Sequence, residues 1–101
     1  MEMTKKVCSF IKYEIEGAEN YAKMAVRLKE SDKTAADTFY AMANQELNHI
    51  DMLHNMCQKH IEIVKNKGEA TEAMTTIWDY ELDNRLKWIA NIKNLLAMYK
   101  S

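Results

Sequence analysis

The sequence predicts an all-α protein, and two observations support that prediction. The 101-residue chain contains two glycines and no proline, and it is rich in residues that favour long, uninterrupted helices. Apolar side chains recur at three- and four-residue steps along three segments, which is the spacing of a helix with one buried face. The composition, 48% apolar and 29% charged, is typical of one globular domain over residues 1–101.

The first helix is predicted over residues 4–30. Val7 and Ile11 begin its apolar face, which continues at helical spacing to the end of the segment. The run "KESDKT" then interrupts the pattern. Ser31 or Asp32 can cap the next helix there, because a side-chain oxygen accepts a hydrogen bond from a free amide at a helix N-terminus.

The second helix is predicted over residues 34–66 and the third over residues 72–100. Between them lies "KNKGEAT", where Gly68 suits the left-handed conformation that commonly ends a helix. Short links make neighbouring helices run in opposite directions. The predicted architecture is therefore three long antiparallel helices.

Each predicted helix carries one glutamate on its apolar face, about halfway along its length. These residues are Glu14, Glu46 and Glu81, and His49 follows Glu46 by one turn near the edge of the same face. The middle levels of antiparallel helices coincide, so we expect the three carboxylates to converge. Converging buried carboxylates repel one another unless a cation binds them. Carboxylates with one imidazole suit iron, manganese or zinc better than copper.

The segments "YEIEGAENYAKMA" and "FYAMANQELNHIDMLH" resemble the first two helices of the ferritin-like superfamily, and of rubrerythrins in particular. In that family a first-helix glutamate precedes a tyrosine by seven residues, as Glu14 precedes Tyr21. The second helix carries Glu-x-x-His, as Glu46 and His49 do. The resemblance implies that these ligands and Glu81 bind one or two ions. Tyr21 is interpreted first as an aromatic core residue, with a hydrogen bond to a metal ligand as the alternative role.

The function that the resemblance implies is redox chemistry of non-haem iron with oxygen or peroxide, of the peroxidase or ferroxidase type. The family's fourth helix, which carries a second Glu-x-x-His, has no counterpart in this sequence, and neither do the CxxC pairs that would deliver electrons. We therefore expect a ferritin-like bundle lacking a fourth helix and completed by a homodimer or larger homo-oligomer.

An alternative interpretation needs no metal. Arg85 falls on the inward face one turn after Glu81, and a buried guanidinium can neutralise a carboxylate. In that case Arg85 and His49 pair with the glutamates, and the chain is a helical module for interaction or assembly.

The remaining sequence features narrow the class of protein. The net charge of −1 argues against a nucleic-acid binder, and no apolar run reaches the length of a membrane span. Cys8 and Cys57 have no CxxC spacing and are interpreted as reduced packing residues. The N-terminal residues do not resemble a secretory signal, so the expected location is the cytoplasm.

Overall fold

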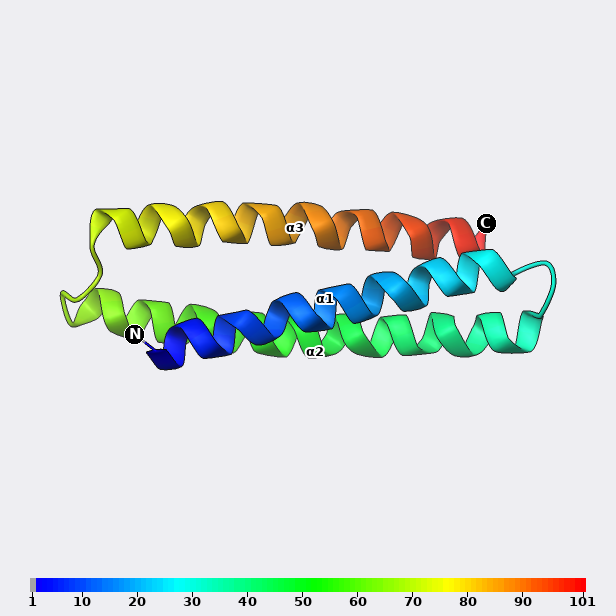
Figure 1. The fold of residues 1–101 in the computed structure, drawn as a ribbon, viewed down its shortest axis with the longest axis horizontal. Helices are drawn as coiled ribbons and strands as arrows, with labels where there is room; N and C mark the ends of the chain where they lie inside the picture. Colours follow the sequence, from blue (N-terminus) through cyan, green and yellow to red (C-terminus); the bar gives the residue numbers. More distant parts are fainter. Residues whose placement is uncertain (1) are drawn as a thin grey trace.

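The computed structural model describes residues 2–101, with side chains from residue 4 onward. It consists of α1 (Glu2–Leu28), α2 (Lys33–Asn66) and α3 (Glu72–Lys100), which confirms the all-α class and places each helix within two residues of its predicted bounds. The chain reverses direction at both links and forms a rod of 55 × 18 × 15 Å (Figure 1). No strand occurs in the described residues, and none of the described helices is long and apolar enough to cross a membrane.

The two links use the capping residues that their sequences contain. Asp32 caps α2, with its side chain accepting a hydrogen bond of 3.1 Å from the amide of Ala35. Gly68 has a φ of 71°, the left-handed conformation predicted at this position. Thr71 caps α3 by accepting a hydrogen bond of 3.1 Å from the amide of Met74.

Helices α1 and α2 form the main packing layer. Alanines such as Ala18, Ala22 and Ala43 alternate with larger apolar residues in this layer, and such small side chains allow two helices to approach closely. The buried residues that α1 and α2 contribute to the main core are Val7, Ile11, Ile15, Ala18, Ala22, Ala43, Ile50, Cys57 and Ile61.

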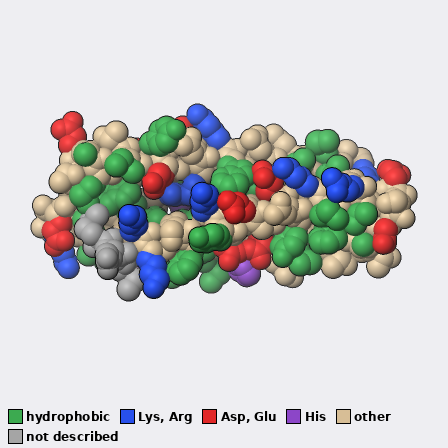
Figure 2. All heavy atoms as spheres, in the orientation of Figure 1, with side chains coloured by type: hydrophobic (Ala, Val, Ile, Leu, Met, Phe, Trp, Pro, Cys, Tyr) green, Lys and Arg blue, Asp and Glu red, His purple; other side chains and the backbone are tan. Residues whose placement is uncertain are grey.

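Although Trp78 in the first half contacts the core, helix α3 is packed most fully along its C-terminal half. Its buried residues are Ile92, Leu96 and Tyr99, all near the C-terminus. In the first half, Ile77 is 54% exposed although the periodicity predicts it inward, and Leu86 is 54% exposed as well. Figure 2 shows hydrophobic side chains gathered on the surface at the end of the rod where α1 and α3 begin, with Lys and Arg side chains around them.

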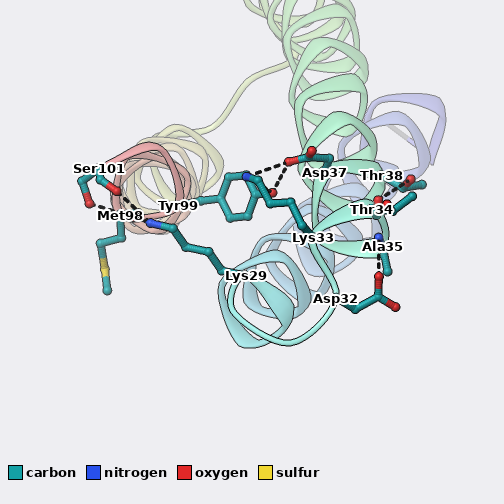
Figure 3. Close-up of polar contacts among 10 residues, drawn as sticks. All are labelled: Lys29, Asp32, Lys33, Thr34, Ala35, Asp37, Thr38, Met98, Tyr99 and Ser101. Atoms are coloured by element: carbon teal, nitrogen blue, oxygen red, sulfur yellow. Dashed lines mark hydrogen bonds and ion pairs between the residues drawn. The ribbon is translucent and has the colours of Figure 1, made fainter.

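Contacts between polar and aromatic groups hold the packed end of α3. Tyr99 reaches across to α2, where its hydroxyl donates a hydrogen bond to Asp37 and accepts one of 3.1 Å from Lys33 (Figure 3). The Tyr99 ring stacks on Tyr40 at 5.0 Å between centroids. Lys29, the residue after α1, donates a hydrogen bond of 2.8 Å to the carbonyl of Ser101. Three helices therefore meet at this end.

Cys8 and Cys57 pack in the core as expected, but the expectation that their thiols are reduced is wrong. The two residues form a disulfide between α1 and α2, with their Cα atoms 5.3 Å apart. Cys8 lies 20 residues before the end of α1 and Cys57 lies 24 residues after the start of α2, so a helical hairpin brings them to within about one turn of the same level. The two cysteines are far apart in the sequence but close in space, because the chain reverses direction between them.

Candidate metal centre

The cluster of possible metal ligands lies between α1 and α2. Glu14 comes from α1, and Glu46 and His49 come from successive turns of α2. The Nδ1 atom of His49 lies 3.8 Å from a carboxylate oxygen of Glu14 and 3.8 Å from one of Glu46. One ligand atom from each residue can be chosen so that all three lie within 4.8 Å of one another. Three predicted ligands therefore come together.

Gly17 of α1 lies beside the carboxylate of Glu46, where an added Cβ would be 3.8 Å from Oε2. This distance is an ordinary van der Waals contact, so the backbone of α1 passes close to the cluster at this position.

The cluster is partly open to solvent. The side chain of Glu46 is 22% exposed, that of Glu14 is 33% exposed and that of His49 is 55% exposed. A distance of 3.8 Å is too long for a direct hydrogen bond. Ligands of one Zn²⁺-like ion lie about 2.0–2.2 Å from it, so pairs of ligand atoms are about 3–4 Å apart. The cluster fits one divalent ion after small side-chain movements, with further coordination positions facing outward.

The structure does not bring Glu81 into this cluster. Its side chain is 50% exposed and lies 3.9 Å from the Arg85 guanidinium, on the same helix. Both residues line a groove between the first halves of α1 and α3. Periodicity places Glu81 on the inward side of α3, but it does not determine how the helix is rotated against its neighbours.

Arg85 is a largely buried charged residue outside the cluster. Its side chain is only 12% exposed, and its burial lowers the guanidinium pKa, which the nearby Glu81 partly opposes. Burial and then the positive charge of Arg85 lower the pKa of His54 on α2. The sequence signal for Arg85 was its inward phase on α3.

Tyr21 packs against an aromatic ring. It stacks on Phe39 of α2, with 6.0 Å between ring centroids.

A polar contact between α1 and α3 was not predicted from the sequence. The Trp88 indole donates a hydrogen bond of 2.9 Å to Glu19. The long Trp88 side chain thereby reaches a partly exposed carboxylate on α1.

Comparisons of the chain with protein-family models, with curated proteins and with solved structures found no match.

Proposed function

We propose that the chain is a carboxylate–histidine metal-binding protein. The observation that carries the proposal is the convergence of Glu14, Glu46 and His49 from two different helices, with their ligand atoms within 4.8 Å. Two carboxylates and an imidazole form a donor set suited to Fe²⁺, Mn²⁺ or Zn²⁺. Two negative charges close together in a half-buried site also favour a cation electrostatically.

The proposed role of the metal is oxidoreductase chemistry with oxygen or peroxide, and it rests on the resemblance to rubrerythrins. Reduction of one peroxide to water takes two electrons, and one iron ion cycling between Fe²⁺ and Fe³⁺ supplies one. The described residues of each chain offer one such cluster. We therefore propose a homodimer in which the exposed side of His49 faces the second copy, so that two clusters lie near each other.

Metal analysis of protein purified without chelator tests this proposal. We expect bound iron, manganese or zinc in the wild type and its loss in Glu46→Gln and His49→Ala. Glu62→Gln is the matched control, because Glu62 is an exposed glutamate on the same helix and lies far from the cluster along the chain. The proposal fails if the wild type carries no metal and binds none when Fe²⁺, Mn²⁺ and Zn²⁺ are added. It also fails if His49→Ala retains wild-type metal content.

A second candidate function is a metal-free interaction module. The observations that favour it are the ion-pair distances from His49 to both glutamates, and the large apolar side chains left exposed on α2 and α3. A protonated His49 would neutralise part of the carboxylate charge without metal. Under this alternative, the metal analysis gives no bound ion while sedimentation shows an assembly that His49→Ala weakens.

The expected cytoplasmic location remains a proposal. The disulfide between Cys8 and Cys57 weighs against it, because thioredoxin and glutathione keep most cytosolic thiols reduced. Alkylation of free thiols in freshly lysed cells would show which form is present where the protein works.

A further inference from the structure

A groove separates the first half of α3 from the first half of α1. It has a volume of about 830 Å³, within the usual range of about 300–1,000 Å³ for small-molecule sites. Met74, Ile77 and Trp78 supply apolar surface from α3, and the aliphatic stems of Lys5 and Lys12 border it on α1. The groove is distinct from the proposed metal centre, because none of the three clustered ligands lines it.

Arg85 gives this groove a polar end with unsatisfied hydrogen-bonding capacity. Its Nε atom is buried and has no hydrogen-bond partner in the part of the chain that the structure describes. The contact from its terminal nitrogen to Glu81 is 3.9 Å, which is an ion pair without a hydrogen bond. A buried donor without a partner is costly, and a guanidinium binds a carboxylate through parallel N–H···O bonds.

The charges around the groove favour an anion. Lys5, Lys12 and Arg85 contribute positive charge to its lining, whereas Glu81 contributes the only negative charge among the described lining residues. The apolar residues extend from Met74 to Trp78, and Arg85 lies about 16 Å along α3 from Met74 at the helical rise. An occupant that fits this order is elongated, apolar at the end that meets Met74 and Trp78, and acidic at the end that meets Arg85.

We propose that the groove between α1 and α3 binds a single-chain amphiphile with a carboxylate head group, whose chain lies on Met74, Ile77 and Trp78 and whose head pairs with Arg85. This site goes beyond the proposed metal function and does not depend on it. The half-exposed Glu81 gives way as the ligand carboxylate takes its place beside the guanidinium.

Calorimetric titration with dodecanoate below its critical micelle concentration tests the proposal on the full-length, disulfide-bonded protein. We expect saturable binding of one dodecanoate per chain, about tenfold or more tighter than binding of the uncharged dodecanol. Arg85→Gln should remove most of this difference and leave dodecanol binding unchanged. Arg27→Gln, which changes an exposed arginine near the far end of α1, is the matched control.

A second variant keeps the test independent of Arg85. Ile77→Glu changes a half-exposed lining residue, so it leaves the core intact and places a negative charge in the path of the ligand. We expect it to weaken dodecanoate binding about tenfold or more. The proposal is overturned if dodecanoate binds no tighter than dodecanol, or if Arg85→Gln binds it as the wild type does. It is also overturned if sedimentation shows a dimer and this dimer buries Trp78 and excludes dodecanoate. In that case a second copy of the chain would fill the groove.

Discussion

The two ends of α3 differ in how they are held. Near the C-terminus, Ile92, Leu96 and Tyr99 are buried, Lys29 just after α1 bonds to the carbonyl of Ser101, and Lys33 of α2 bonds to the Tyr99 hydroxyl. In the first half of the helix no apolar side chain is fully buried, and a groove lies between this half and α1. A long amphipathic helix in a small bundle can thus be anchored at one end while the other end presents a surface for binding.

The largest expected effect is a difference in stability loss between alanine substitutions in the packed half and in the open half of α3. Ile92→Ala removes a fully buried side chain and should lower the free energy of unfolding by about 2–5 kcal/mol. Ile77→Ala changes a half-exposed side chain in the open half and should lower it by less than about 1 kcal/mol. Urea denaturation of both variants measures the difference. Equal losses would mean that the two halves of α3 are packed alike.

Reduction of the Cys8–Cys57 disulfide should have the next largest effect. The bond links residues 49 apart in sequence, and removing such a cross-link destabilises a protein by about 2–4 kcal/mol. Denaturation with and without a phosphine reductant measures this loss, and a Cys8→Ser/Cys57→Ser double variant should not respond to the reductant. If the stability of the wild type is the same with and without reductant, the claim that the disulfide stabilises the fold is contradicted.

The polar anchor at the C-terminal end should make stability depend on pH at both extremes. Hydrogen bonds from Tyr99 and Lys33 lower the pKa of Asp37 below 3.8, so its contribution is present above the unfolded-state pKa and is lost as pH falls through the folded-state pKa. Hydrogen bonds with Tyr99 and Asp37 raise the pKa of Lys33 above 10.5, so its contribution is present below that value and is lost as pH rises through the folded-state pKa.

Tyr99→Phe tests this anchor, because it removes the hydroxyl that both partners contact. We expect a smaller destabilisation than for Ile92→Ala, together with a weaker dependence of the melting temperature on pH below about 4. Thermal melts of wild type and variant across that range provide the measurement. The same dependence of melting temperature on acid pH in both proteins would show that the Tyr99 hydroxyl does not lower the pKa of Asp37.

The sequence predicted the parts of the fold that depend on local chemistry. Proline-free helical periodicity, the Asp32 cap and the Gly68 turn set the helix bounds, and the structure follows them. The convergence of Glu14 with Glu46 and His49 was also predictable, because a short link fixes the level at which α1 and α2 face each other.

The parts that depend on the rotation of α3 could not be predicted from the sequence. Glu81 has the inward phase of its helix, but it lies beside Arg85 in the groove instead of joining the cluster. Periodicity identifies the apolar face of a helix, but it does not determine which neighbouring helix packs against that face. The disulfide was missed for a different reason. The lack of CxxC spacing favoured reduced thiols, whereas a helical hairpin brings Cys8 and Cys57 to similar levels.

The central claim is that Glu14, Glu46 and His49 bind a metal ion, and thermal unfolding with added Mn²⁺ tests it most directly. An ion that binds only the folded chain raises its stability, by about 2.7 kcal/mol at a hundredfold excess over the dissociation constant. We expect the melting temperature of the wild type and of Glu62→Gln to rise with Mn²⁺ concentration, and that of Glu46→Gln to stay constant. Melting temperatures that are independent of Mn²⁺ in the wild type, or that rise equally in Glu46→Gln, would contradict the claim.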